Sequence, residues 1–229
     1  MPTIQKTLMF AMGFVTSLAS FATVCAVLGL PEWVTGKIEF RDSSFTNGTI
    51  LVTYGLFRGM STQELNSGLA ESDLVFEVLK ILPNSSRKSL HSVVIVLLFL
   101  SLFTSLLSSG LTFFNSISNP YQTWLGPTSI FVWNGLNMAF VLVAMILFVV
   151  NTQANGLSVA LSSLLYSSQG NIYGSTTHIY GYVFWLMIPI LLFNSITILL
   201  ITVYQNLRYH RKQEHRKPME NAPKDGILF

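Results

Sequence analysis

Four long apolar stretches dominate the pattern of hydrophobic and polar positions along the chain. A membrane-spanning helix needs about 20 mostly apolar residues. The stretches that meet this length are residues 8–30, 92–114, 130–150 and 181–203. The pattern therefore predicts four membrane-spanning helices, and Pro189 inside the last of them predicts a kink.

The segment between the first two stretches, residues 31–91, has a different pattern that predicts a small sheet. Apolar and polar residues alternate from Thr35 to Arg41, and Thr49 to Phe57 is rich in β-branched residues. Asn47-Gly48 between them is a hairpin turn signal. A further strand in residues 151–180 is weakly indicated.

Two short helices are predicted later in the same segment. Ser61-Thr62-Gln63-Glu64 has the spacing of a capping box. Asp73 to Leu82 carries an apolar face that includes Leu74 and Val78. We expect that face to pack on the sheet or the membrane rim, with a partner-binding helix as the alternative.

Composition and charge agree with a membrane protein. Hydrophobic residues make up 51% of the chain and charged residues 10%, where soluble domains have about 25% charged residues. No Lys, Arg, Asp or Glu occurs between Lys88 and Arg208. These values exclude a soluble globule and a disordered chain. With Cys25 as the single cysteine, a disulfide scaffold and a cysteine-based zinc site are excluded as well.

The positions of the basic residues predict the orientation. Positive residues in short flanking segments stay cytoplasmic. Five follow the last apolar stretch, namely Arg208, Arg211, Lys212, Arg216 and Lys217. The tail (204–229), the N-terminus (1–7, with Lys6) and the loop 115–129 are therefore expected in the cytoplasm. Segments 31–91 and 151–180 are expected outside, and the plasma membrane is the expected location.

Two N-x-[ST] triplets support this orientation. Asn47 and Asn84 are the acceptors, and both fall in residues 31–91. We predict that both are N-glycosylation sites. A cleaved signal peptide is the alternative for the first stretch, which is longer than the usual apolar core of about 7–15 residues. A retained helix is favoured.

Side-chain constellations for catalysis are close to absent from the sequence. It has no H-E-x-x-H, Walker or G-x-S-x-G motif, and no acid/base pair in the apolar stretches. We predict no enzymatic activity, cofactor, metal or nucleic-acid partner. His91 and His178 are interpreted as polar anchors at the membrane interface.

The amides of Asn134, Asn137 and Asn194 lie inside the predicted spans. We expect them to hydrogen-bond across helices, with the lining of a pathway as the alternative. Small residues such as Gly13 and Ser17 recur every fourth position, which favours close helix packing over self-association. Cys25 is expected to be buried as a small apolar residue.

The tail carries short interaction motifs. Ile227-Leu228-Phe229 ends the chain with the spacing of a PDZ-domain ligand, and a scaffold or cytoskeletal partner is therefore predicted. Residues 204–207 have the spacing of a tyrosine sorting signal, although interfacial anchoring by Tyr204 is favoured. The basic run that follows either holds anionic lipid or only sets the topology.

The chain resembles the claudin-like tetraspan superfamily in four features. These are the four spans, the sheet-bearing first loop, Trp33, and the later unit Gly55-Leu56-Phe57. The block Tyr54-Gly55-Leu56-Phe57-Arg58-Gly59, the start Met1-Pro2 and Phe184-Trp185 are similar to the clarins. The resemblance covers essentially the whole chain. It implies a claudin-like fold, a four-helix membrane bundle with a small extracellular β-sheet/helix subdomain.

Clarins resemble adaptors or organisers of membrane partners and the cytoskeleton, and the resemblance implies that function here. An auxiliary subunit of an ion channel and a claudin-like cell-junction protein are the alternatives. The family carries cysteines in the first outer loop, and residues 31–91 have none. This departure counts against the junction function, which depends on a rigid outer surface.

Overall fold

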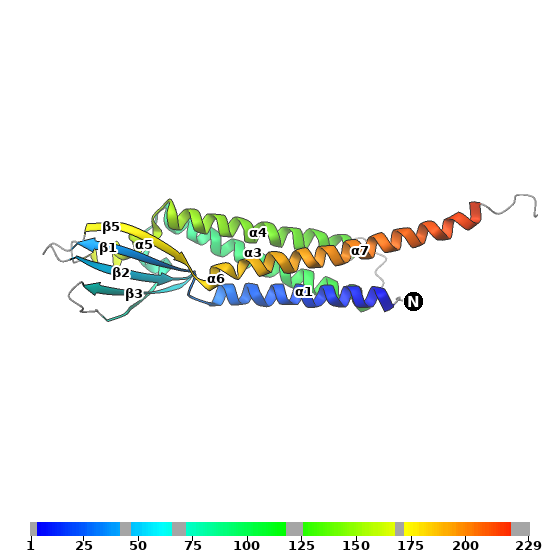
Figure 1. Cartoon of the computed structure of the whole chain (residues 1–229), viewed down its shortest axis with the longest axis horizontal. Coiled ribbons are helices and arrows are strands. Elements are labelled where there is room, and N and C mark those ends of the chain that lie inside the picture. The colour runs from blue at the N-terminus through cyan, green and yellow to red at the C-terminus, as the bar shows by residue number, and fades with distance from the viewer. Residues whose placement is uncertain (1–3, 42–46, 66–71, 118–125, 168–171, 221–229) are drawn as a thin grey trace, which may run out of the picture.

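The structure is a computed structural model of the chain. It describes residues 4–41, 47–65, 72–117, 126–167 and 172–220, with side chains up to His210 and at Gln213. Four long helices run side by side, and a β-sheet covers one end of the bundle (Figure 1). The N-terminus lies at the opposite end. This arrangement confirms the predicted fold class of a four-helix membrane bundle with a small sheet.

The four spans are longer than the apolar stretches that predict them. They are α1 (Ile4–Gly29), α3 (Ser86–Ile117), α4 (Pro127–Gln153) and the pair α6 (Tyr182–Trp185) and α7 (Met187–Glu220). α1 packs against α3 and α7, and α4 closes the bundle against the same two helices. The last span is interrupted at Leu186, because Pro189 has no N–H to donate to the Trp185 carbonyl.

Both loops on the sheet side contribute to one antiparallel sheet, whose strand order is β4-β3-β2-β1-β5. Its strands are β1 (Val34–Arg41), β2 (Asn47–Tyr54), β3 (Arg58–Leu65), β4 (Leu74–Glu77) and β5 (Ile172–Tyr180). β5 is the strand that the sequence indicates weakly in residues 151–180. It pairs with β1 over almost its whole length, so the second loop completes the sheet begun by the first.

The predicted turn at Asn47-Gly48 is wrong. Both residues belong to β2, where they pair with Arg41 and Phe40. The connection between β1 and β2 falls on residues 42–46, outside the described residues. Gly48 serves a different purpose, because a Cβ atom there would lie 2.6 Å from the Phe40 ring. Close approach to an aromatic ring, and not a turn conformation, therefore requires this glycine.

The two short helices predicted from local patterns are also wrong in large part. Ser61 and Gln63 lie in strand β3 and face inward, while Met60 and Glu64 point outward. Residues 73–82 contain β4 followed by a single helical turn, α2 (Val78–Ile81). The free edge of β2 offers hydrogen bonds to β3, and β3 in turn pairs with β4. Sheet pairing therefore overrides the local helix signal in both segments.

One helix was not predicted at all. α5 (Leu157–Leu165) follows α4 after Gly156, whose φ of 61° is left-handed and turns the chain back. α5 contacts β1 and β2 and covers one face of the sheet. Leu157 and Leu161 are fully buried in the resulting core.

Candidate functional site

An aromatic cluster fastens the sheet to the helical bundle. Phe148 of α4 is fully buried at its centre. The ring centroids of Trp33, Phe184, His91 and Tyr54 lie 4.9, 6.2, 6.4 and 6.5 Å from that of Phe148. These spacings are typical of attractive aromatic pairs. The cluster joins α3, α4 and α6 to residues of the first loop.

Three hydrogen bonds reinforce this junction. The Trp33 indole donates to the Val27 carbonyl at 3.1 Å, and the Gly181 amide donates to the Trp33 carbonyl at 2.8 Å. His91 Nε2 donates to the Leu56 carbonyl at 2.8 Å, which leaves Nδ1 buried without a partner in the described part of the chain. Interfacial anchoring is therefore the wrong role for His91, which holds the β2–β3 turn on the bundle.

A second hydrogen-bonded chain crosses from the sheet to α5. The Tyr54 hydroxyl lies 2.9 Å from Ser158 Oγ, which lies 3.3 Å from His178 Nδ1. Burial raises the pKa of Tyr54 to about 12, and burial lowers the pKa of His178 below its usual value. Both side chains are therefore uncharged near neutral pH. They link β2, α5 and β5 without forming an ion pair.

A line of polar side chains, here called the polar seam, runs through the centre of the bundle. All four long helices contribute to it, and its main members are buried. They are Ser17, Ser20, Ser101, Ser108, Asn134, Asn137, Asn194 and Thr197. In an environment without water such groups are satisfied by one another.

In one half of the seam each helix supplies one side chain. Asn137 Nδ2 donates to Asn194 Oδ1 at 3.2 Å, and Asn194 Nδ2 donates to Ser20 Oγ at 3.1 Å. Ser101 Oγ donates to Asn137 Oδ1. Asn194 Nδ2 also donates to the Ile190 carbonyl of its own helix at 2.7 Å. The two amides and two hydroxyls thus form one connected cross-helix group.

The other half of the seam lies nearer the N-terminal end of α1. Asn134 Nδ2 donates to Ser108 Oγ at 2.7 Å, and Ser108 Oγ lies 3.3 Å from Ser17 Oγ. The Thr16 and Thr197 hydroxyls are 2.7 Å apart. Asn134 Oδ1 is buried and has no partner in the described ranges. This half therefore still has one free acceptor, which a buried water would satisfy.

Comparison with known proteins assigns a family to this architecture. A family model described as Clarin-2-like matches residues 4–201. Clarin-3 of Homo sapiens is 58% identical and Clarin-3 of Mus musculus 57% identical, each over the full length of both chains. The chain belongs to the clarin family. Clarin-1 of Homo sapiens is 26% identical over 82% of this chain and 83% of its own length. This clarin is a multi-pass membrane protein.

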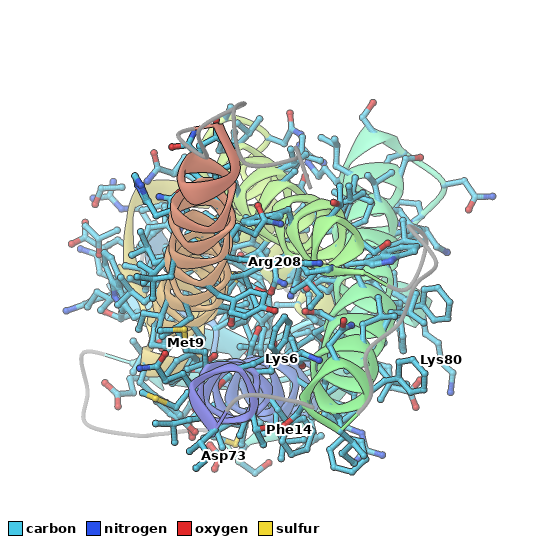
Figure 2. The ribbon with its side chains drawn as sticks, turned by 90° about the vertical axis from the view of Figure 1, so that its right-hand side faces the viewer. Lys6, Met9, Phe14, Asp73, Lys80 and Arg208 are labelled. Atoms are coloured by element: carbon cyan, nitrogen blue, oxygen red, sulfur yellow. The ribbon has the colours of Figure 1, made fainter. Side chains whose placement is uncertain are left out.

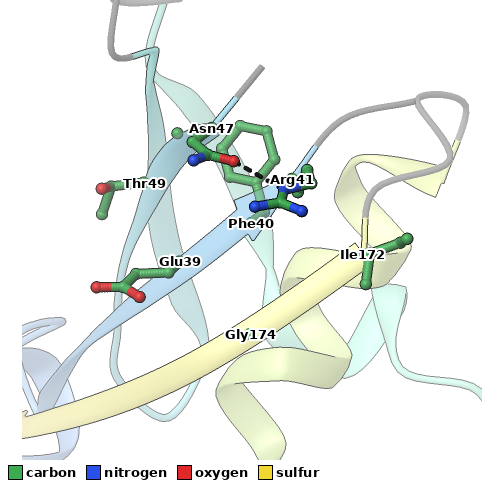
Figure 3. A pocket seen from close by; sticks show the side chains of 8 residues that line it. Glu39, Phe40, Arg41, Asn47, Thr49, Ile172 and Gly174 are labelled. Carbon is green, nitrogen blue, oxygen red and sulfur yellow. Dashed lines mark hydrogen bonds between the residues drawn. The ribbon is translucent and has the colours of Figure 1, made fainter. Parts of the chain in front are cut away.

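The two predicted glycan acceptors lie at the sheet end of this clarin. Asn47 is exposed at the start of β2, and its Oδ1 accepts a hydrogen bond from Arg41 Nε at 3.0 Å. Figure 3 shows this pair beside a hollow at the sheet tip that Glu39, Thr49 and Ile172 also line. Asn84 is exposed in the bend between α2 and α3.

The other sequence-predicted positions are scattered over this clarin. Cys25 is exposed on the outer face of α1, so the prediction that it is buried is wrong. Tyr204 packs edge-on against Phe10, with ring centroids 5.0 Å apart. Ile227, Leu228 and Phe229 lie outside the described residues.

Sequence reasoning missed Ser20 and Phe148, which are central to the seam and the junction. Polar residues at Thr16, Ser17 and Ser20 repeat at helical spacing inside an apolar stretch, and this signal predicts an inward polar face. Phe148 has no such signal, because it is one aromatic residue among many in an apolar helix.

Proposed function

We propose that this clarin is a non-enzymatic organiser of membrane partners that joins an outer recognition surface to a cytoplasmic tail. One observation carries the proposal. α7 starts beside the sheet and continues as one helix, past the ends of its neighbours, into the basic segment that ends at Glu220 (Figure 1). Because the sheet is fastened to the bundle by the Phe148 cluster, a partner on either side contacts the same rigid body.

The proposal places the sheet outside the cell and both termini in the cytoplasm of a plasma-membrane protein. The basic residues from Arg208 onward support this orientation. The exposure of Asn47 and Asn84 at the sheet end supports glycosylation of both. Ser20 supports a retained first helix, because cleavage after α1 would remove a partner of Asn194.

A glycosidase mobility shift tests this topology in mammalian cells. Wild type is compared with Asn47→Gln, Asn84→Gln and the double variant. We expect wild type to shift, each single variant to shift less, and the double variant not to shift. As a control, an N-x-[ST] triplet is introduced near Asn221, in the tail. Modification of that triplet would show that the tail lies outside the cell, and this result would contradict the proposed orientation.

On the cytoplasmic side, we propose that Ile227-Leu228-Phe229 binds a PDZ-domain scaffold linked to the cytoskeleton. A free carboxylate and apolar side chains at the last and third-last positions suit addition to a domain's exposed strand. The test is binding of a peptide of residues 220–229 to an array of PDZ domains. A glycine appended after Phe229 should abolish binding, and Gln213→Ala in a longer peptide should leave it unchanged.

Co-capture from epithelial membranes tests the organiser function itself. Full-length chains with two different tags report self-association, and a chain ending at Glu220 isolates the contribution of the tail. We expect the full-length chain to capture one set of partners that is lost when the tail is removed, and a second set that is retained. Recovery of no partner above background would contradict the proposal, and changed currents on co-expression with a channel would favour the auxiliary-subunit alternative.

A further inference from the structure

The outer edge of β5 has no strand beside it in the described part of the chain. β5 is the last strand in the sheet order, and among the described elements it contacts β1 extensively and no other. Figure 1 shows β5 along the upper border of the sheet. A strand in this position presents a row of backbone N–H and C=O groups to its surroundings.

The register of β1 and β5 identifies the groups that face outward. The Gly181 amide donates to the Trp33 carbonyl at 2.8 Å, and bonded and non-bonded pairs alternate along an antiparallel ladder. Ile179 and Thr177 are therefore bonded to β1. The residues that alternate with them direct their backbone groups away from β1, and these groups have no other partner among the described residues. They are Thr176, His178 and Tyr180, here called the open row.

The open row belongs to a regular stretch of strand. Pairing of β5 with β1 is continuous from Tyr180 to Thr176. The register shifts only farther from the bundle, between the pairs Ile38–Thr176 and Phe40–Tyr173. Bulges are one way in which proteins prevent strand addition at an edge, and this irregularity lies beyond the open row.

The opposite edge of the sheet carries charges that hinder strand addition. Glu77, the last of the four residues of β4, forms an ion pair with Lys80 at 2.9 Å. Asp73 directly precedes β4, and both Asp73 and Lys80 lie at the periphery of the molecule in the end-on view of Figure 2. β5 has nine residues without a charge or a proline. Charges and proline are common protection for an edge strand, so the sheet is protected at β4 and open at β5.

We propose that β5 binds an extended segment of a partner protein, which adds to the sheet as a further strand. The open row supplies the hydrogen bonds to the backbone of that segment. Ile179 is 65% exposed on the outer face, where its neighbour on β1 is Thr35. The segment therefore carries an apolar side chain beside Ile179 and no charge there. The inference rests on the organiser function proposed above and names its outer recognition surface.

A second copy in the same membrane does not fit this edge. The strands run along the axis of the bundle, so a twofold axis normal to the membrane keeps the direction of β5 and exchanges the two faces of its sheet (Figure 1). Ile179 on the outer face of one copy would then lie beside residues of the face that α5 covers in the other. A strand of a different protein has no such restriction.

The test uses the full-length protein in lipid nanodiscs. The probe is a phage-displayed library of random short peptides, selected on wild type, and the affinity of each selected peptide is then measured. The variants are His178→Pro and His178→Val. Both remove the imidazole and its contact with Ser158, but proline alone also removes the outward N–H, and proline at such an edge position leaves the bonds to β1 in place. His178→Val is therefore the matched control.

We expect the selected peptides to be uncharged, with apolar residues at alternate positions. Their Kd should be about tenfold higher on His178→Pro, because the outward donor is lost and the proline ring occupies the place of the incoming strand. Their Kd on His178→Val should equal that on wild type.

Amide hydrogen exchange, resolved to single residues, gives a second measurement on wild type alone. Without peptide, the amides of Thr176 and His178 should exchange quickly and those of Thr177 and Ile179 slowly. Bound peptide should slow the first pair. This result decides the question even where His178→Pro does not fold.

Three results would overturn the proposal. One is equal affinity of every selected peptide for His178→Pro and wild type. The second is slow exchange at Thr176 and His178 in the free protein, because the chain itself would then cover the edge. The third is co-capture of two differently tagged chains that is lost in His178→Pro and kept in His178→Val, which would assign the edge to a second copy. The organiser function fails separately, when no partner is recovered from membranes.

Discussion

Two regions of this clarin have opposite distributions of polar and apolar side chains. They are the sheet domain, made of β1 to β5 with α2 and α5, and the bundle of long helices. In the sheet domain Trp33, Ile38 and Ile50 are fully buried, while Glu39 and Lys37 point outward. In the bundle Ser20 and the amides of the polar seam are buried. Large apolar side chains cover its outside, among them Val15, Phe99, Phe103, Ile146 and Leu199.

The difference follows from the two solvents. Water around the sheet drives apolar groups inward, so the hydrophobic effect stabilises that domain. Lipid tails are as apolar as leucine, so burial of an apolar side chain inside the bundle gains little. Close packing and cross-helix hydrogen bonds must hold the helices together, and small and polar residues supply both. The same substitution should therefore have different effects in the two regions.

The largest expected effect is at the junction, where the two regions meet. Phe148→Ala should lower the free energy of unfolding by about 3–5 kcal/mol, because it empties the centre of the aromatic cluster. Phe103→Ala, the same change at a 56% exposed position on α3, should have little effect. The measurement is thermal unfolding in lipid nanodiscs, and its readout is the fraction of protein that stays monodisperse at each temperature. An equal loss of stability in both variants would contradict the difference between the junction and the lipid-facing surface.

A second prediction compares two glycines. A Cβ at Gly181 would lie 2.3 Å from the Glu32 carbonyl oxygen, and backbone cannot move aside cheaply. We expect Gly181→Ala to destabilise the protein by about 1–3 kcal/mol. A Cβ at Gly135 on the outer face of α4 meets nothing within 4 Å. Gly135→Ala should therefore stabilise the helix by about 0.5–1 kcal/mol, and opposite signs in the same unfolding assay are the critical result.

The polar seam gives a third, smaller effect. Asn194→Ala removes the acceptor of Asn137 and the donor to Ser20, and should lower stability by about 1–2 kcal/mol. Asn206→Ala, an exposed amide on the same helix, is the control and should change stability very little. Unfolding in nanodiscs measures both. If Asn194→Ala proved neutral, the seam would contribute nothing to bundle stability.

The smallest effect concerns pH in the sheet domain. Burial holds the pKa of His178 below its unfolded value near 6.5, so the folded state favours the neutral ring. Its contribution to stability is therefore present above about pH 6.5 and is lost as the pH falls through the folded pKa. We expect the unfolding midpoint to fall modestly from pH 7 to pH 5, and less in His178→Asn.

His210→Asn, at an exposed position beyond the bundle, is the control for that experiment and should keep the wild-type pH profile. If His178→Asn showed the full acid sensitivity, the loss of stability would come from another group, and the Ser158–His178 contact would have no measurable role.

Local pattern predicted the spans and the first two strands, but it failed where the sequence signal and the tertiary environment disagree. Residues 61–64 have a helix-capping spacing, and they form β3 because β2 offers an unpaired edge. Asn47-Gly48 has the composition of a turn, and it pairs with β1 because Phe40 needs the space beside Gly48. Cys25 was expected inside on the basis of its residue type, but helix rotation places it outside.

The sequence by itself determined that this protein crosses a membrane four times and carries a sheet beside the first span. A helix in a lipid interior requires a long stretch of uncharged residues, and a half-exposed strand requires alternating apolar and polar residues. Both patterns are formed by residues that are contiguous in the chain. Only the tertiary structure decided that β5 completes the sheet and that Ser20 meets Asn194. These pairs are far apart in the chain, and the rotation and register that bring them together are set by packing of whole elements.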